Sequence, residues 1–364
     1  VIRYQREHGP WSVYFKPQGL GAAPPHWLGA WRGDGILARI DDRRMAEAVL
    51  RTQVPAVDLR GALADLPIPL VGVNNRGVIR LAVEHLMERG FRRFAFCGTR
   101  RGENRNQDER ADRFAAAIAD SGFSCDVFQP FGTRAKSWEQ EQREIVAWLR
   151  GLPKPVGLMT CHDDRGQQVL DACLRADLAV PDAVAILGVD NDPFLCSLST
   201  PQLSSIDTNP ERVGYEAAAL LDRMMKGARP PQRPLFFEPR GLVVRQSTDV
   251  SAVSDPHVAH AARLIRTHAL AGATIKELAA QVPVSRSALF RRFKEHLGHS
   301  PKEELTRVRL ERAKELLKHS ALPVAVVAAR VGYAEAKHFI AIFRRATGCT
   351  PLRYRKESAT TQPD

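Results

Sequence analysis

A repeat of about fifty residues near the carboxyl end constrains the fold more than any other feature of this sequence. Two sets of positions recur at constant spacing. The pairs 49 residues apart are Ile275 and Val324, Leu278 and Val327, Ala279 and Ala328, and Val282 and Val331. The pairs 50 residues apart are Leu289 and Phe339, Phe293 and Phe343, Gly298 and Gly348, and Pro301 and Pro351. Such a period indicates a duplicated supersecondary unit.

Each copy has the pattern of two helices joined by a turn. The first helix carries apolar residues at i, i+3, i+4 and i+7, and the second carries them four apart before a glycine. Thr274 and Glu277 have the spacing of a capping box. Ser300 and Glu303 share that spacing, with Pro301 at the favoured first helical position. The sequence therefore predicts two helix-turn-helix units.

The segment between the copies, residues 301–320, is predicted to be one amphipathic helix of about five turns. It would hold the two units at a fixed separation, and one face of DNA returns after roughly 34 Å. Residues 255–364 hold 20 Lys and Arg against 10 Asp and Glu, which places +10 of the net charge of +12 here. This concentration favours a polyanion partner, double-stranded DNA. A solvated basic surface, or a helical bundle whose repeat reflects packing alone, is the alternative.

Residues 1–246 alternate short apolar runs with helical patterns. The runs typical of strands are DGILARI, VPAVDL, IPLVGVN, RRFAFCG, CDVFQPF, PVGLMTC, VAILGVD and SSIDTN. Helices are expected at 78–90 and 166–176. This alternation favours a largely parallel sheet covered by helices, built as one or two doubly wound units. Residues 247–256 are the expected linker, and residues 357–364 are an expected disordered tail.

Several functional classes are disfavoured. No run approaches twenty apolar residues and no secretory signal is present, so neither a membrane span nor export is indicated. The six cysteines are scattered singly, which indicates reduced thiols and a cytoplasmic protein. We expect it to associate with the nucleoid. No phosphate loop, HExxH, GxSxG or GxGxxG motif is present, and nothing supplies a nucleophile beside the acidic pair Asp163 and Asp164. We expect neither an enzyme nor a metal or cofactor.

The repeated segment resembles the AraC/XylS family of transcription regulators. The stretches that carry the resemblance are SRSALFRRFKEHLGHSP, RLERAKELL and VGYAEAKHFIAIFRRATGCTPLRYRK. The resemblance implies an all-α DNA-binding domain over residues 257–356, in which the second helix of each unit contacts bases. In the first unit it implies base contacts by Arg286, Ser287 and Arg291, with Arg291 bidentate on guanine. Arg292 and Lys294 are expected to contact phosphates.

The second unit departs from the family pattern. Ala336, Ile340 and Ala341 stand where relatives usually carry polar or Arg side chains. The remaining polar candidates are Glu335, Lys337 and His338. We expect weaker base readout by this unit, with phosphate anchoring or apolar contact with thymine methyl groups as the alternatives.

Residues 1–246 resemble the periplasmic-binding-protein-like effector domain of LacI/GalR regulators. The matching stretches are VPAVDL, VNNRGVIRLAVEHLMERGFRRFAFCG, DERADRFAAAIADSGF, PVGLMTCHDDRGQQVLDAC, VPDAVAILGVDND and LSSIDTN. The resemblance implies an α/β fold of two doubly wound lobes. The strand and helix with which that fold usually begins are not found before Val1, so the first strand is expected to be missing.

Sugar recognition needs carboxylates and amides for adjacent hydroxyls, and an Arg that bridges two of them. In an open α/β sheet such groups lie at the carboxyl ends of strands. Asp58, Asp163 and Asp190 end or follow predicted strands. Arg110 lies where the LacI/GalR pattern places its sugar-contacting Arg, and His162 lies where that family often has Asn. The alternative is that an Asp after a strand serves as an N-cap or turn residue.

A sensor that precedes AraC-type units along the chain resembles the XylR-type xylose-responsive activators. EHGPWSVYF, WRGDGILARI and CHDDRGQQVLDAC carry this resemblance. It implies a homodimeric activator of pentose catabolic genes that acts with RNA polymerase and takes a pentose, D-xylose first, as effector. The residues themselves argue only for a small polyhydroxylated ligand. A hexose or purine sensor, or a repressor of the same architecture, is the alternative.

Overall fold

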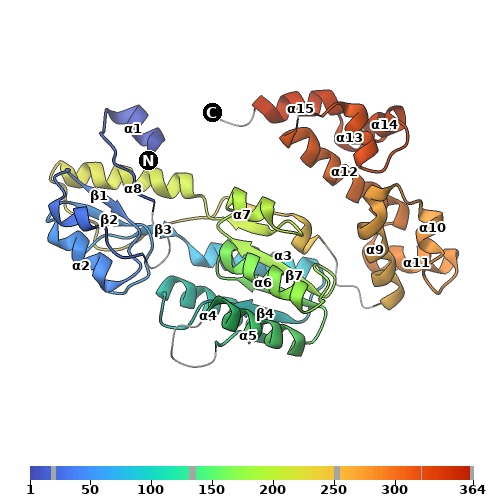
Figure 1. Ribbon diagram of the computed structural model, residues 1–364, viewed down its shortest axis with the longest axis horizontal. Coiled ribbons are helices and arrows are strands. Elements are labelled where there is room, and N and C mark those ends of the chain that lie inside the picture. The colour runs from blue at the N-terminus through green and yellow to red at the C-terminus, as the bar shows by residue number, and fades with distance from the viewer. Residues whose placement is uncertain (18–21, 131–136, 250–254, 321, 361–364) are drawn as a thin grey trace. The chain divides into compact units, whose positions relative to one another are not determined.

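The computed structural model describes residues 1–17, 22–130, 137–249, 255–320 and 322–360, and it divides the chain into two compact units, Val1–Val250 and Ser251–Asp364 (Figure 1). The first unit consists of two α/β lobes, and the described part of the second contains helices and no strand. Among the described helices, none combines the length and the apolar character needed to cross a bilayer.

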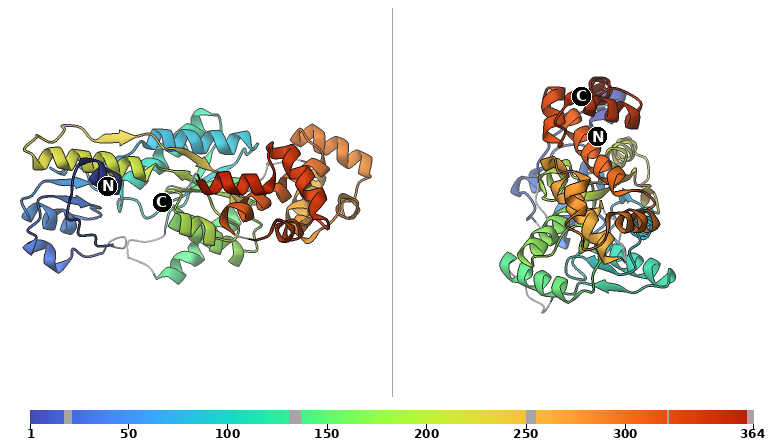
Figure 2. Two further views of the ribbon diagram at one scale, coloured as in Figure 1. Left: turned by 90° about the horizontal axis from the view of Figure 1, so that it is seen from above. Right: turned by 90° about the vertical axis from the view of Figure 1, so that its right-hand side faces the viewer.

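The first lobe contains two short parallel strand pairs. Its elements are α1 (Ile2–His8), β1 (Ile36–Ala38), α2 (Arg43–Arg51), β2 (Ala56–Asp58), β3 (Val71–Val73), α8 (Pro210–Met225) and β9 (Leu235–Phe237). β1 pairs with β2 and β3 pairs with β9, and a parallel bridge between Asp58 and Leu70 joins the two pairs. Helix α8 packs on β1, β2 and β3, and α1 lies beside α8 (Figures 1 and 2).

The second lobe is a six-stranded sheet with strand order β10-β8-β7-β6-β4-β5, parallel except for β10. Its strands are β4 (Phe94–Cys97), β5 (Cys125–Val127), β6 (Val156–Thr160), β7 (Val184–Val189), β8 (Ser204–Asp207) and β10 (Gly241–Val243). Its helices are α3 (Asn75–Glu88), α4 (Arg105–Asp120), α5 (Trp138–Gly151), α6 (Asp163–Arg175) and α7 (Pro193–Leu198). Every residue of β4, β6 and β7 is buried, as expected for parallel strands covered on both faces.

The chain passes between the lobes three times, after β3, after β8 and after β9. Two hydrogen bonds tie the lobes together at the end of β2. The Arg105 amide donates to the Ala62 carbonyl at 3.1 Å, and Asn106 Nδ2 donates to the Arg60 carbonyl at 3.3 Å. The carboxyl end of β2 therefore lies next to the start of α4.

All eight strands expected from the sequence are present as β1 to β8. The three-residue strands β9 and β10 were not expected. The linker expected at 247–256 is too long at both ends. Residues Gln246–Thr248 form a short 3-10 helix in which Ser247 and Thr248 are fully buried, and Asp255 already caps the next helix. The last helix continues to Thr360, into the tail expected at 357–364, and the rest of that expected tail lies outside the described residues.

The second unit contains seven α-helices within its described residues. They are α9 (Pro256–His268), α10 (Ile275–Ala279), α11 (Arg286–Leu297), α12 (Pro301–His319), α13 (Val324–Arg330), α14 (Ala336–Thr347) and α15 (Pro351–Thr360). Both expected capping boxes are formed, by Thr274 with Glu277 and by Ser300 with Glu303. Helices α11 and α14 end at Gly298 and Gly348, whose left-handed φ angles of 77° and 78° are almost identical.

The unit has two hydrophobic cores, one for each copy of the repeat. The first gathers buried residues from α9, α10 and α11 around Phe293, and the second gathers those of α13 and α14 around Phe343. Each phenylalanine is fully buried, which stabilises its core by about 2 kcal/mol. Helix α12 belongs to both, because Leu305 packs in the first core and Leu310 in the second. The repeat is thus confirmed as two packed units on one connector.

Candidate effector site and nucleic-acid interface

Arg110 is a buried guanidinium fixed by two elements of the fold. Its Nε donates to Asn75 Oδ1 at 2.9 Å, and its Nη1 donates to the Cys161 carbonyl at 2.6 Å. Asn75, which follows β3, is itself oriented by a 2.9 Å bond from Nδ2 to Glu109 Oε2. Arg110 therefore has a fixed direction, set at the ends of β3 and β6.

Asp190 follows β7 and has an unusual backbone. Its φ is 112°, outside the ranges that Asp normally adopts, and the φ of Asn191 is 55°, in the left-handed region that Asn adopts more readily than most residues. The side chain is exposed to solvent although protein crowds around it, and this crowding raises its pKa while Arg110 and Arg60 lower it. Within the described chain the carboxylate has no hydrogen-bond partner. Backbone strain beside a carboxylate without a hydrogen-bond partner is typical of a ligand site.

Three successive backbone amides hold this strained turn in place. The Asp190 amide donates to the Ile206 carbonyl at 2.9 Å, and the Asn191 amide donates to Ser205 Oγ at 3.0 Å. The Asp192 amide donates to Asp163 Oδ2 at 2.7 Å. The neighbouring strand β8 and the start of α6 thus determine where the Asp190 carboxylate lies.

Asp163 is almost fully buried at 1% exposure, and its carboxylate is engaged by the protein. Ser205 Oγ donates to Oδ1 at 2.6 Å, and the Cys196 thiol donates to Oδ2 at 3.4 Å. Burial raises the pKa of Asp163 to about 7, against these hydrogen bonds, which lower it. A Cβ at Gly188 would lie 2.2 Å from Asp163 Oδ1, so the carboxylate requires glycine in β7.

Asp58 holds the loop that follows β2. Its carboxylate accepts from the amides of Ile40 at 3.3 Å, Arg60 at 2.8 Å and Gly61 at 3.0 Å. Burial raises the pKa of Asp58, and the three backbone donors oppose that rise. The side chain is 2% exposed, so most of its acceptor capacity is taken by the protein itself.

His162 caps helix α6 with its ring. Nδ1 accepts from the Arg165 amide at 3.1 Å, so the proton of the neutral ring lies on Nε2. Burial and the neighbouring Arg165 lower the pKa of His162 to about 3, so the ring stays neutral. Nε2 is a buried donor for which the described residues offer no acceptor. An unsatisfied buried donor at this position suits a ligand oxygen.

The structure brings His162, Asp190 and Arg110 into one electrostatic neighbourhood, because Arg110 influences the pKa of both other groups. Arg39 after β1 and Arg60 after β2 act on the same two groups and were not expected from the sequence. Their position directly after predicted strands is the sequence signal that could have identified them. No grouping of His, Cys, Asp and Glu suited to a metal ion occurs in the part of the chain that the structure describes.

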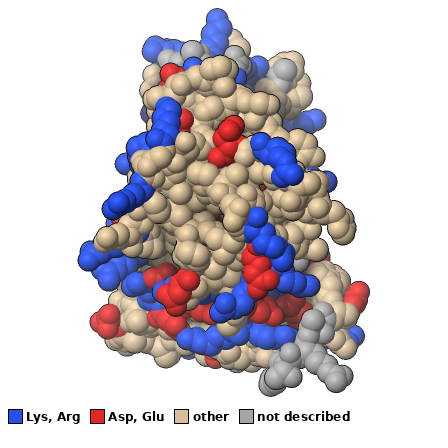
Figure 3. Space-filling view, turned by 90° about the vertical axis from the view of Figure 1, so that its left-hand side faces the viewer, with Lys and Arg blue, Asp and Glu red and all other residues tan. Residues whose placement is uncertain are grey.

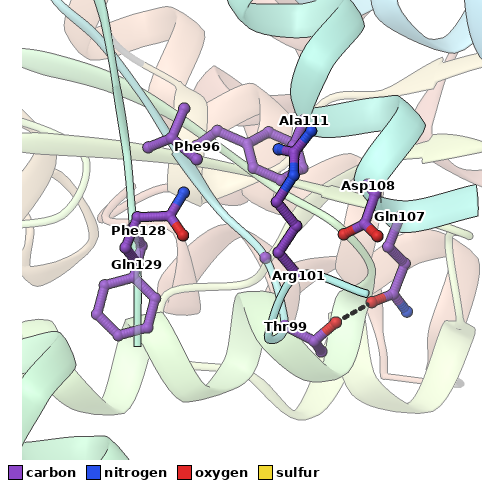
Figure 4. Close-up of a pocket in the computed structure, with 10 residues that line it drawn as sticks. Phe96, Thr99, Arg101, Gln107, Asp108, Ala111, Phe128 and Gln129 are labelled. Carbon is purple, nitrogen blue, oxygen red and sulfur yellow. Dashed lines mark hydrogen bonds between the residues drawn. The ribbon is translucent and has the colours of Figure 1, made fainter. Parts of the chain in front are cut away.

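A separate small hollow lies within the second lobe, at the carboxyl ends of β4 and β5 (Figure 4). Phe96, Phe128 and Gln129 line one part of it, and Arg101 extends toward it beside Asp108. Thr99 Oγ1 donates to Gln107 Oε1 at 2.5 Å at its edge. None of the five expected effector residues lines this hollow.

Helix α11 presents a basic face to solvent. Arg286, Ser287, Arg291 and Lys294 are all exposed, at spacings that place them along one side of the helix. Leu289 and Phe293 point into the core on the opposite side. Arg292 differs, because its Nη1 forms a 3.1 Å ion pair with Asp255, the N-cap of α9.

Helix α14 presents a mixed face. Glu335, Lys337 and His338 are exposed at its start, and the His338 ring packs edge-on against Tyr333. Ile340 is 36% exposed on the same helix. Arg344 and Arg345 are exposed in its last turn and were not expected as candidates. Arg344 stands fifty residues after Lys294, so the repeat was the signal that pointed to it.

The charge distribution of the sensor is mixed. At the end that carries the first lobe, Lys and Arg side chains are interspersed with Asp and Glu (Figure 3). This agrees with the net charge of +2 that remains for residues 1–254, from 33 Lys and Arg against 31 Asp and Glu. The basic character of the chain belongs to the helical unit.

Comparison with known proteins supports both units. A family model of the periplasmic binding protein-like domain matches residues 83–248, and one of the helix-turn-helix domain matches residues 278–357. The xylose operon regulatory protein of Escherichia coli K12 is 31% identical over 330 residues, which cover 89% of this chain and 84% of the relative. The protein of that name from Haemophilus influenzae is 27% identical over 88% of this chain and 84% of the relative.

Solved structures agree. The structure of the xylose-binding transcription activator XylR matches with a TM-score of 0.80 and 28% identity, over 98% of this chain and 92% of that one. A LacI family regulator from Mycobacterium smegmatis matches at 22% identity and a TM-score of 0.52, over 63% of this chain and 86% of that one, which supports the sensor fold. A two-lobed binding-protein fold followed by duplicated helix-turn-helix units defines a DNA-binding transcription regulator, not an enzyme. The chain belongs to the XylR-type family of xylose operon regulatory proteins.

Proposed function

We propose that the chain is a xylose-dependent activator of pentose catabolic genes, whose first unit binds D-xylose between its lobes. The observation that most directly supports this proposal is the unpaired Asp190 carboxylate, which a strained turn holds close enough to Arg110 for Arg110 to lower its pKa. Relatives over most of the chain are named for the xylose operon, and one solved relative is named as xylose-binding. A carboxylate and a guanidinium together bind adjacent sugar hydroxyls, one accepting and the other donating.

Three of the expected residues are assigned to the sugar and two to the wall of the site. Asp190 accepts from two hydroxyls, Arg110 donates to a hydroxyl, and the Nε2 proton of His162 donates to a hydroxyl or ring oxygen. Asp58 and Asp163 shape the site, because their oxygens already accept hydrogen bonds from the protein. Trp27 and Trp31 pack against each other with ring centroids 5.6 Å apart, and we assign them to the first lobe rather than to the sugar.

The second unit binds double-stranded DNA with α11 and α14, the second helix of each helix-turn-helix unit. Arg291 and Arg286 on α11 supply base contacts together with Ser287, and Lys294 supplies a phosphate contact. Arg292 holds α9 through Asp255 and contributes to phosphate binding only through the field of its charge. In α14, Lys337, His338 and Glu335 lie at the DNA surface, and Ile340 is placed for thymine methyl groups.

The regulator acts in the cytoplasm, on the nucleoid, as a homodimer that recruits RNA polymerase. Sugar binding closes the lobes and favours one arrangement of the DNA-binding units over another. The shift requires that D-xylose bind the active arrangement more tightly, because a ligand moves an equilibrium only by its differential affinity.

The test is calorimetric titration of the full chain with D-xylose, L-arabinose, D-ribose, D-glucose and hypoxanthine. We expect D-xylose to bind and to raise the melting temperature, because a ligand of the native state stabilises it by mass action. Binding of D-glucose or hypoxanthine alone contradicts the assignment of a pentose. In the same samples, binding to duplex DNA is followed with increasing salt, and insensitivity to salt contradicts the phosphate contacts.

A further inference from the structure

The end of the sensor, residues Arg245–Asp249, is bound tightly to strand β8. The Arg245 amide donates to Ser204 Oγ at 2.8 Å, and that hydroxyl donates back to the Arg245 carbonyl at 3.0 Å. Thr248 Oγ1 donates to the same Ser204 hydroxyl at 2.7 Å. Ser247 and Thr248 are fully buried. This segment directly precedes the DNA-binding unit in the chain, so its packing sets where the connection begins.

The next residue of the same strand serves the candidate effector site. Ser205 Oγ accepts from the Asn191 amide at 3.0 Å and donates to Asp163 Oδ1 at 2.6 Å. Successive side chains of a strand point to opposite faces. Two adjacent residues of β8 therefore hold the sensor's last segment on one side and the Asp190–Asn191 turn on the other.

The Arg245 side chain joins these two places directly. Its Nη2 donates to Asn191 Oδ1 at 2.8 Å, and its Nη1 donates to the Leu203 carbonyl at 2.9 Å. Asn191 has a left-handed φ of 55°, and its neighbour Asp190, with the unusual φ of 112°, is the unpaired carboxylate. Any movement of the turn on ligand binding must stretch or release this hydrogen bond.

We infer that Arg245 is a positioning residue of the effector site, and that its bond to Asn191 transmits the state of the Asp190 turn to residues 245–249. This inference rests on the proposed function, because it assumes that the effector engages Asp190. Strained backbone conformations occur at switch regions, where a ligand can select one conformation over another, and Arg245 contacts the residue next to the strained one.

The test measures hydrogen–deuterium exchange of the full chain in two peptides, one containing residues 190–192 and one containing residues 245–249. The variants are Arg245→Gln, Asn191→Gly and their combination. Asn191→Gly keeps a residue that tolerates the 55° φ and removes only the side-chain acceptor. The matched control is Arg240→Gln, because Arg240 Nη2 donates to Asn209 Oδ1 at 3.3 Å, also on an Asn with positive φ, without touching Asn191.

Without ligand, we expect each single variant to accelerate exchange in both peptides by about three- to tenfold, the loss of one hydrogen bond. The double variant should show no further acceleration, because both changes remove the same bond. The Arg240→Gln control should leave both peptides unchanged. Additive effects, or an effect confined to the mutated peptide, would overturn the inference. This part of the experiment uses no sugar, so its outcome does not depend on the proposed function.

With saturating D-xylose, the wild-type chain should exchange more slowly in both peptides. In Arg245→Gln, D-xylose should still slow exchange at 190–192 but no longer at 245–249, and its affinity should fall only about three- to tenfold. Equal protection of 245–249 in the variant and the wild type contradicts the inference. Absence of sugar binding by the wild-type chain contradicts the proposed function instead, and the ligand-free arm still decides on Arg245.

Discussion

The guanidinium carbon of Arg309 lies 5.1 Å from the centroid of the Tyr333 ring. Arg309 is in the middle of the connector α12, and Tyr333 lies in the turn between α13 and α14. The same guanidinium donates to the carbonyls of Ala269 and Ala273, both at 2.9 Å, in the segment before α10. The Arg309 side chain thus joins the segment before α10 in the first helix-turn-helix unit to the turn of the second unit.

Gly332 should be intolerant of any side chain at this junction. Its φ is 83°, and an added Cβ would lie 2.4 Å from the Ala269 carbonyl oxygen. We expect Gly332→Ala to lower the free energy of unfolding by about 3 kcal/mol, from the left-handed backbone and the clash together. Urea unfolding followed by circular dichroism measures the change.

The control for that variant is Gly298→Ala. Gly298 has a φ of 77° but open space around an added Cβ. Gly298→Ala should therefore lower the free energy of unfolding by the cost of the left-handed backbone alone, about 1 kcal/mol. Equal losses for the two variants would show that the close approach of the units has no energetic weight.

Arg291→Ala should weaken binding to the specific operator by about 1 to 3 kcal/mol and relax base preference at one position, because the lost contact is to a base. Lys294→Ala should weaken binding to all duplexes alike and reduce the salt slope by about 1. Fluorescence anisotropy on operator and random duplexes over a salt series measures both. The assignment is wrong if Arg291→Ala lowers affinity equally on the two duplexes.

Asp190→Asn should reduce the affinity for D-xylose about 10- to 100-fold, since hydrogen bonds to a charged acceptor are stronger than those to an amide. Asp171→Asn is the control, because Asp171 pairs with Arg175 on the surface of α6. Calorimetric titration measures the affinity of each. Wild-type affinity in Asp190→Asn would remove Asp190 from the effector site.

The stability of the sensor should fall as the pH falls below about 6.5. Burial lowers the pKa of His85 and of His162 to about 3, so between those values the unfolded chain binds protons that the folded chain does not. At pH 5 each His should destabilise the fold by about 2 kcal/mol relative to neutral pH. Asp163, with its pKa raised to about 7, acts in the opposite sense and offsets part of this loss.

Replacement of His85 isolates one part of this pH dependence. His85 Nε2 lies 2.8 Å from Thr248 Oγ1, a contact that the amide of His85→Gln can replace. The variant should lose less stability between pH 7.5 and pH 5 than the wild type, whereas His26→Gln, at an exposed position, should match the wild type. All five Trp residues lie before residue 150, so tryptophan fluorescence in urea reports on this unit alone. A pH profile unaltered by His85→Gln would refute the assignment.

The double helix-turn-helix unit was predictable in detail because its signals are local. The capping boxes and the glycines that end α11 and α14 act within a few residues of where they stand, and the recurrence of Phe293 as Phe343 repeats the same local pattern. The strands of the sensor were predictable for a similar reason, since a short apolar run such as the six residues of β7 is typical of a buried strand. The strands β9 and β10 have three residues each and give no comparable pattern.

The positions of the candidate residues after strands were predictable from the sequence, but their hydrogen-bond partners were not. Asp58, Asp163 and Asp190 all follow strands, and sequence alone does not distinguish a carboxylate that binds ligand from one that accepts backbone amides. The distinction depends on partners distant in the chain, as with Ser205 and Asp163. Arg245 was missed because it lies 54 residues from Asn191, its hydrogen-bond partner. The ion pair of Arg292 was missed for the same reason, since its partner Asp255 caps another helix.

Because α12 is part of both cores, the DNA contacts proposed for α11 and α14 lie at a spacing that the protein cannot stretch. One base pair inserted between the two recognition sequences turns the second by about 35° around the duplex and moves it by about 3.4 Å. A rigid connector absorbs neither change. On the proposed function, new target genes would therefore come under the control of this regulator through base substitutions in their upstream DNA more readily than through insertions or deletions.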